Sequence, residues 1–290
     1  MPYCVVGHGR EPSPFKLYYE LHGDTLQPRK RLLFIAGLSV SCQSWDQQYP
    51  VLASTQGYLC CIFDNRGAGF SECPPGPYKT SAMAQDVLEL LLHLGWSSDI
   101  HLIGVSMGGM ISLEFASQFP EFLASLTLIS TTAGAPPKLS AIFGLFGVAT
   151  IRDPDIRLMR NMELVFPQGF LASASSDPRF PTQRERIFHI AKHRTTLTRA
   201  TTTAGAAAHI AASLGHSVSD SRLNAIRLSL PGKVQVLTGT WDKLVDPSNS
   251  AHLAKVLACP LHTYIGGGHS LPTEQADWVN NLICTLCEQE

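Results

Sequence analysis

Residues 99–121 read DIHLIGVSMGGMISLEFASQFPE, with one serine, Ser106, set between glycines two positions away on either side. The apolar run IHLIG before the serine is typical of a buried β-strand, and the segment GGMISLEFASQF after it is typical of a helix. A Gly-x-Ser-x-Gly pattern is weak evidence alone, but at a strand-to-helix turn it predicts a nucleophilic serine at the edge of a sheet. The alternative, a glycine-rich turn with an incidental serine, explains this context less well.

Short apolar runs like IHLIG recur along the chain. Several are apolar on both faces, which suits strands of a parallel sheet that is covered on both sides. We expect strands at residues 31–36, 58–63, 100–104, 125–130, 233–239 and 261–266. Helical patterns lie between them, at residues 80–95, 108–118, 248–257 and 274–286. Strands that alternate with helices predict an α/β fold with a mostly parallel sheet flanked by helices.

The alternation stops between residues 135 and 231, where strand signals vanish and Ala, Thr, Ser, His and Arg dominate. Because the strand pattern resumes afterwards, this segment is interpreted as a helical cap inserted into the fold. The predicted division is a core of residues 1–134 and 232–290 with a cap of residues 135–231. Within the cap, LSAIFGLFGVATI, with Phe143 and Phe146, is interpreted as a buried helix, a membrane-contacting lid or a pocket wall.

Composition excludes several classes of function. The chain has 290 residues, 44% hydrophobic and 16% charged, and a formal net charge of −1 without a long basic run. We therefore expect no nucleic-acid partner and no binding to an anionic membrane surface. The start lacks the pattern of a signal peptide, and the longest uncharged apolar stretch is too short to span a bilayer, so a cytoplasmic protein without stable membrane insertion is expected. The oligomeric state is left open.

Metal and cofactor chemistry has little support in the sequence. Eight cysteines are scattered along the chain, and Cys284 and Cys287 form a single CxxC without a second pair. Such an isolated pair favours helix packing over a zinc or redox site. We therefore expect no metal and no cofactor.

A nucleophilic serine needs a base and an acid that orients the base. His269 follows a predicted strand and three glycines in YIGGGHSLPTE, where a loop presents its imidazole. Two acids follow the strand KVQVLTG, in TWDKLVDP. Asp242 comes first and is assigned as the acid, whereas Asp246 precedes a proline and is interpreted as a helix cap.

With these residues in place, the chain resembles the α/β-hydrolase fold superfamily, in the branch with a helical cap. The resemblance covers nearly everything outside the cap and rests on AGLSVSCQSW (36–45), DNRGAGFS (64–71), GVSMGG (104–109), GTWDKLVDP (239–247) and GGGHS (266–270). It implies an oxyanion hole made by the backbone N–H groups of Leu38 and Met107. Relatives usually have His-Gly where this chain has Ala36-Gly37, so the loop lacks one hydrogen-bonding side chain but keeps the backbone donor of Leu38.

The resemblance implies a serine hydrolase with Ser106 as nucleophile, His269 as base and Asp242 as acid, acting on a small carboxylic ester or lactone. Carbon-carbon hydrolases and cofactor-free perhydrolases share this triad, and some members of the fold only bind ligands. Relatives with a carboxylate nucleophile are excluded because position 106 is serine. The DNRGAGFS loop is interpreted as structural, and His209 as a core or surface histidine that the cap could also turn toward the cleft.

Overall fold

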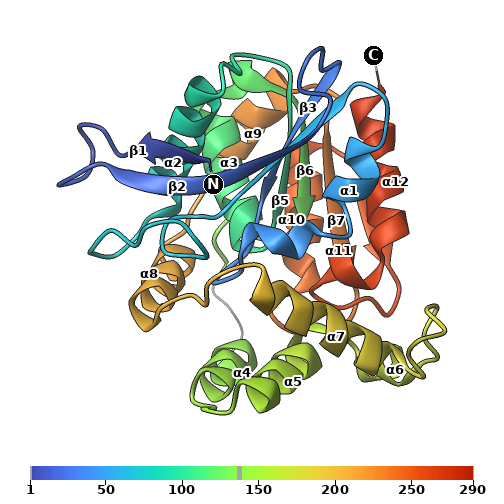
Figure 1. Cartoon of the computed structure of the whole chain (residues 1–290). Helices are drawn as coiled ribbons and strands as arrows, with labels where there is room; N and C mark the ends of the chain where they lie inside the picture. Colours follow the sequence, from blue (N-terminus) through green and yellow to red (C-terminus); the bar gives the residue numbers. More distant parts are fainter. Residues whose placement is uncertain (1, 136–138, 290) are drawn as a thin grey trace.

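The computed structural model describes residues 2–135 and 139–289. Within them, an eight-stranded sheet crosses the middle of the molecule in the order β1-β2-β4-β3-β5-β6-β7-β8 (Figure 1). Its strands are β1 (Tyr3–Val6), β2 (Phe15–Gly23), β3 (Lys30–Ile35), β4 (Tyr58–Phe63), β5 (Ile100–Val105), β6 (Leu123–Ile129), β7 (Val234–Gly239) and β8 (Leu261–Tyr264). β2 pairs antiparallel with β1 and β4, and all other neighbours are parallel. The predicted α/β fold with a mostly parallel sheet is confirmed.

The six strands expected from apolar runs all form, and β4 is buried along its whole length. The antiparallel pair β1 and β2 was not expected. β2 reads FKLYYELHG, with charged residues within it and only part of its length buried. β2 lies between β1 and β4 and is only partly buried, so it lacks the continuous apolar run that marks a central parallel strand, which explains the omission.

Two helical layers cover the sheet. One face packs against α2 (Thr80–His93), α3 (Met107–Gln118), α9 (Asp220–Ser229) and α10 (Pro247–Leu257). The other packs against α1 (Tyr49–Ala53) and α12 (Ala276–Cys287). Alternate residues of each central strand enter the two cores: Leu33 and Ile35 of β3 lie on the first face, and Leu32 and Phe34 on the second. This period of two is what a doubly covered strand requires.

The expected helix at 274–286 is divided in the structure. A short helix, α11 (Leu271–Glu274), ends before Gln275, whose backbone is not helical, and α12 starts at Ala276. The break allows α11 to stay beside the loop that carries His269 while α12 packs on the sheet.

The segment between β6 and β7 folds into helices. These are α4 (Leu139–Ala149), α5 (Pro154–Val165), α6 (Gln168–Ala172), α7 (Gln183–Thr196), α8 (Thr203–Leu214) and α9. Figure 1 shows α4 to α8 gathered at one end of the sheet, whereas α9 packs against α3 and α10 in the flanking layer. Met162, Phe166, Leu171 and Ile187 form a small core of their own within this segment. The division at residues 135 and 231 stays a prediction.

In the part of the chain that the structure describes, no helix is both long and apolar enough to cross a membrane.

Candidate active site

Ser106 occupies the sharp turn from β5 to α3. Its backbone has φ 56° and ψ −121°, a conformation that residues with a side chain rarely adopt and that costs about 1–3 kcal/mol. The turn is held by two hydrogen bonds from β6 and the residues after it: the Ser106 N–H donates to the Ile129 carbonyl at 2.9 Å, and the Thr131 hydroxyl donates to the Ser106 carbonyl at 2.7 Å. These bonds hold the strained serine at the carboxyl edge of the sheet.

The two glycines that flank Ser106 allow this turn to be tight. A Cβ at Gly104 would overlap the Ser112 hydroxyl and the Gly108 carbonyl, and a Cβ at Gly108 would overlap the Ile35 carbonyl. Side chains at either position would push α3 away from β5 and β3. The Gly-x-Ser-x-Gly spacing therefore has a packing reason in this fold.

His269 lies on the loop between β8 and α11, next to the carboxyl edge. Its Nδ1 atom is 2.8 Å from Asp242 Oδ2, and the histidine is only 8% exposed. The His269 backbone N–H donates to the carbonyl of Val165, at the end of α5, at 2.9 Å. The helical segment between β6 and β7 thus helps to fix the loop that carries the imidazole.

Asp242 lies in the loop between β7 and α10 and is 4% exposed. Its Oδ1 atom accepts the backbone N–H groups of Leu244 at 2.9 Å and Val245 at 3.0 Å, which leaves Oδ2 for the histidine. Asp246 behaves differently: its side chain caps α10 by accepting the Ser248 N–H at 2.9 Å. The structure therefore pairs His269 with the first of the two acids.

Ser106 and His269 line one cavity of about 480 Å³. Among the described residues no hydrogen bond joins the Ser106 hydroxyl to the imidazole, as is common in ligand-free sites. The wall is mostly apolar and comes partly from the segment between β6 and β7, including Ala141, Met162 and Ile187. A larger hollow of about 610 Å³ lies along α7 and is lined by neither Ser106 nor His269.

The loop proposed to supply an oxyanion donor lies beside the serine. A Cβ placed on Gly37 would be 3.4 Å from Ser106 Cβ and 3.9 Å from its hydroxyl oxygen, and Leu38 lines the cavity. Met107 is the first residue of α3, where a helix leaves its N–H groups without intrahelical acceptors. Within the described residues neither the Leu38 nor the Met107 N–H has a protein acceptor.

The DNRGAGFS loop makes contacts outside the cavity. Asp64 accepts the backbone N–H groups of Cys42 at 2.7 Å and Phe70 at 2.8 Å, and Ser71 bonds the Asp64 carbonyl. The Arg66 guanidinium is 2% exposed and makes a two-point ion pair with Asp86. These contacts tie neighbouring loops together.

The positions of His209 and Phe143 test two expectations about which side chains face the cavity. His209 is fully buried and does not line the cavity, so the idea that it faces the cleft is wrong. Phe143 is 71% exposed and also absent from the cavity wall. The side chain of Phe146 lies outside the described residues. Among the described side chains of α4, Ala141, two residues before Phe143, lines the cavity.

Sequence reasoning missed two polar features of this region. Glu274 is 8% exposed, its carboxylate accepts the Gly268 N–H at 2.8 Å, and burial raises the pKa of this carboxyl to about 7. Arg194, from α7, lines the cavity and pairs with Asp46. Glu274 was detectable only as an acid five residues after His269. No local pattern marks the Arg194 pair, whose partners are far apart in the chain.

Among the described residues, no group of three or more His, Cys, Asp and Glu side chains is arranged to hold a metal ion. The cysteines of α12, Cys284 and Cys287, are unpaired thiols.

Comparison with known proteins identifies the family. A family model described as "alpha/beta hydrolase fold" matches residues 30–275. The chain belongs to the α/β-hydrolase fold family. Its structure resembles an esterase from Thermogutta terrifontis, with a TM-score of 0.77, 24% identity and coverage of 98% of this chain and 97% of that one. An enol-lactonase from Burkholderia xenovorans gives a TM-score of 0.78 at 20% identity, over 99% of this chain and all (100%) of the other.

Sequence relatives of this α/β hydrolase include a putative carbamate hydrolase RutD from Caulobacter segnis, 27% identical over 281 residues, 93% of this chain and 96% of that protein. A second protein of that name, from Stutzerimonas stutzeri, is 32% identical over 130 residues, which cover 44% of this chain and 48% of that protein. The 3-oxoadipate enol-lactonase 2 of Acinetobacter baylyi is 32% identical over 105 residues, which cover 36% of this chain and 38% of that protein. The family and these relatives support a hydrolase of this fold.

Proposed function

We propose that this α/β hydrolase cleaves a small carboxylic ester or lactone through an acyl-enzyme on Ser106. The observation that carries the proposal is the bond of 2.8 Å between His269 and Asp242 at the wall of the cavity that Ser106 also lines. Asp242 stabilises the His269 tautomer that carries its proton on Nδ1. In this tautomer Nε2 is free of a proton and can accept the one from the serine hydroxyl. The serine oxygen then attacks the carbonyl carbon, and water later releases the acyl group.

In this mechanism the carbonyl oxygen becomes negatively charged, and the backbone N–H groups of Leu38 and Met107 would stabilise that charge. Among the described residues neither N–H group has a protein acceptor, and the loop of Leu38 passes beside Ser106. One well-placed donor of this kind typically contributes about 3–4 kcal/mol to transition-state stabilisation. The strained backbone of Ser106 keeps the nucleophile near these donors at no further cost during the reaction.

The chemistry of the cavity favours a small, uncharged substrate. Its wall is mainly apolar. Arg194 is the one arginine among the described lining residues, and it is paired with Asp46. A substrate carboxylate would have to compete with Asp46 for that guanidinium. We further propose that α4 to α8, within the predicted cap of residues 135–231, form a cap, since α4, α5, α7 and α8 all contribute to the wall, whereas α9 packs in the flanking layer.

A carbamate is the second candidate substrate, because the relative aligned over nearly its whole length is named a putative carbamate hydrolase. A carbamate carbonyl would be attacked in the same way. It is less electrophilic than an ester carbonyl because both neighbouring heteroatoms donate electrons to it.

The test has two steps. A fluorophosphonate probe should label the native protein and leave Ser106→Ala unlabelled, which reports an activated serine. Turnover of short p-nitrophenyl esters, lactones and aryl carbamates is then compared. We expect esters or lactones to be hydrolysed over many turnovers, so that product release continues beyond one equivalent of enzyme. Labelling followed by arrest at one equivalent would indicate a binding protein with a reactive serine, and preference for carbamates would favour the second candidate.

A further inference from the structure

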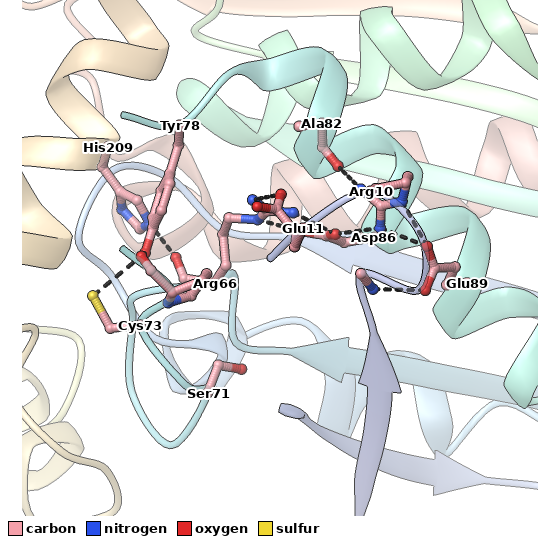
Figure 2. A network of polar contacts seen from close by, with 12 residues as sticks. Arg10, Glu11, Arg66, Ser71, Cys73, Tyr78, Ala82, Asp86, Glu89 and His209 are labelled. Carbon is pink, nitrogen blue, oxygen red and sulfur yellow. Dashed lines mark hydrogen bonds and ion pairs between the residues drawn. The ribbon is translucent and has the colours of Figure 1, made fainter. Parts of the chain in front are cut away.

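His209, on α8, binds two backbone groups from different loops. Its Nδ1 atom accepts the Ser39 N–H at 3.0 Å, and its Nε2 atom lies 2.6 Å from the Arg66 carbonyl, the contact drawn in Figure 2. A backbone N–H can only donate and a carbonyl can only accept, so the ring is neutral with its proton on Nε2. Burial lowers the pKa of this imidazole, which favours the same neutral form.

Ser39 directly follows Leu38, the proposed oxyanion donor. Its backbone has φ 56°, a left-handed conformation that is unfavourable for serine. The Ser39 hydroxyl is buried and has no hydrogen-bond partner among the described residues, so the side chain does not hold its own backbone in place. Two side chains from the segment between β6 and β7 bond the Ser39 backbone instead. His209 accepts the Ser39 N–H, and the Thr201 hydroxyl donates to the Ser39 carbonyl at 3.2 Å.

Two glycines let α8 come close enough for this contact. A Cβ on Gly205 would overlap the Gly67 carbonyl, and a Cβ on Gly67 would be 3.2 Å from Gly205 Cα. Gly205 is one turn before His209 on the same helix. This backbone-to-backbone approach brings the imidazole within reach of the Arg66 carbonyl.

The Arg66 end of the contact is rigidly anchored. Figure 2 shows its guanidinium beside Asp86 and Glu11, with Nε–Oδ2 at 2.6 Å to Asp86 and a second bond at 2.6 Å to Glu11. The same guanidinium lies 4.8 Å from the centre of the Phe15 ring. These contacts fix the side chain of Arg66, whose carbonyl is the partner of His209 Nε2. The imidazole therefore links an anchored residue to the Ser39 N–H.

We propose that His209 is a positioning residue for the oxyanion loop, residues 36–40, and sets the place of the Leu38 N–H through its bond to Ser39. The inference rests on the proposed function, since it assigns His209 to the same reaction. Position 36 is alanine, and the side chains that bond the backbone of this loop come from outside it: His209 and Thr201 bond Ser39, and Asn65 donates to the Ala36 carbonyl at 3.0 Å. The same helix lines the cavity with Ile210, Ser213 and Leu214. The helix that contacts the substrate is therefore bonded to the oxyanion loop through His209.

The decisive variant is His209→Phe, which keeps a ring but removes both hydrogen bonds. We expect kcat to fall about 10- to 100-fold with KM changed less than about 2-fold, because a displaced oxyanion donor weakens the transition state more than substrate binding. The inhibition constant of a trifluoromethyl ketone, which forms a charged tetrahedral adduct with serine, should rise by a similar factor. The affinity for the matching unreactive methyl ketone should not change. His209→Gln, which keeps one acceptor and one donor, should recover part of kcat.

The matched control is His216→Phe. His216 is also buried in the same segment, but its Nδ1 atom bonds the Thr80 hydroxyl at 2.9 Å, away from Ser39. It should lower the melting temperature and leave kcat and the trifluoromethyl ketone constant unchanged. Equal losses of kcat in both phenylalanine variants, a change in KM alone, or full activity of folded His209→Phe would overturn the proposal.

Thr201→Val supplies the answer if His209→Phe does not fold. Thr201 is only partly buried, and its loss should lower kcat about 3- to 10-fold in the same direction because one of the two bonds to Ser39 remains. An unchanged kcat in folded Thr201→Val would then overturn the proposal. Failure of the proposed function looks different: the native protein would neither hydrolyse esters nor bind the trifluoromethyl ketone more tightly than the methyl ketone.

Discussion

The imidazole of His269 and the carboxylate of Asp242 lie 2.8 Å apart although 27 residues separate them in the chain. Each is held by its own loop: Asp242 by two backbone N–H groups that follow it, and His269 by the Val165 carbonyl at the end of α5. Because Oδ1 of Asp242 is occupied by backbone donors, Oδ2 is directed to the histidine. The pair is therefore oriented before any substrate enters.

Ser106→Ala tests the nucleophile. It should lower kcat/KM for short esters by at least about 1,000-fold, because without the hydroxyl no acyl-enzyme forms. Alanine must adopt the same positive φ as serine, so the fold is expected to remain, which circular dichroism would check. Retention of full activity by a native-like variant would remove Ser106 from the mechanism.

Asp242→Asn and Asp246→Asn separate the two acids. The first should reduce kcat about 1,000- to 10,000-fold, because an amide cannot stabilise the charged imidazolium and favours the wrong tautomer. The second should leave kcat nearly unchanged and cost less than about 1 kcal/mol, since asparagine also caps helices well. Steady-state kinetics and thermal melts on both variants decide the matter. A large kinetic loss in Asp246→Asn alone would move the acid to that position.

Glu274→Gln tests the buried carboxyl beside the His269 loop. Its folded-state pKa, about 7, is raised above the ordinary value of 4.5, so the native protein binds this proton more tightly than the unfolded chain does. The contribution of Glu274 to stability is then fully present below pH 4.5 and is lost as the pH rises to about 7. The loss amounts to at most about 3 kcal/mol.

Relative to the wild type, Glu274→Gln should therefore gain stability as the pH rises from 5 to 8. Urea unfolding at both pH values measures the difference, in which the titration of all other groups cancels. Glu121→Gln, at an exposed position, is the control and should show no such trend. A pH-independent difference for Glu274→Gln would show that the carboxyl is not held protonated in the folded state.

Ala141→Leu and Phe143→Ala compare two positions of α4. Ala141 is buried and lines the cavity, so leucine there should shorten the space for the acyl chain. Each methylene excluded costs about 0.8 kcal/mol, or about 4-fold, so octanoate esters should lose at least 10-fold in kcat/KM relative to acetate esters. Phe143→Ala should leave the chain-length preference unchanged because that side chain is 71% exposed. A shift in Phe143→Ala with none in Ala141→Leu would contradict this assignment of the wall.

The sequence by itself determined the parallel strands and the turn of Ser106. Continuous apolar runs such as YLCCIF are local signals for doubly covered strands, and the glycines around Ser106 report close packing that only glycine permits. The proposed order of Ser106, Asp242 and His269 rests on the same signals, since each residue follows a strand that the sequence predicts. Strand β2 was not predicted from the sequence, because it is only partly buried and has no continuous apolar run.

Only the tertiary structure decided which polar side chains serve the site from a distance. His209 and Ser39 are 170 residues apart and meet because Gly67 and Gly205 let two backbones touch. The burial of Glu274 and the exposure of Phe143 likewise depend on what the rest of the chain packs against them. Local sequence records the propensity of a segment to form a strand, a turn or a helix, whereas burial and long-range hydrogen bonds arise only when distant segments are brought together.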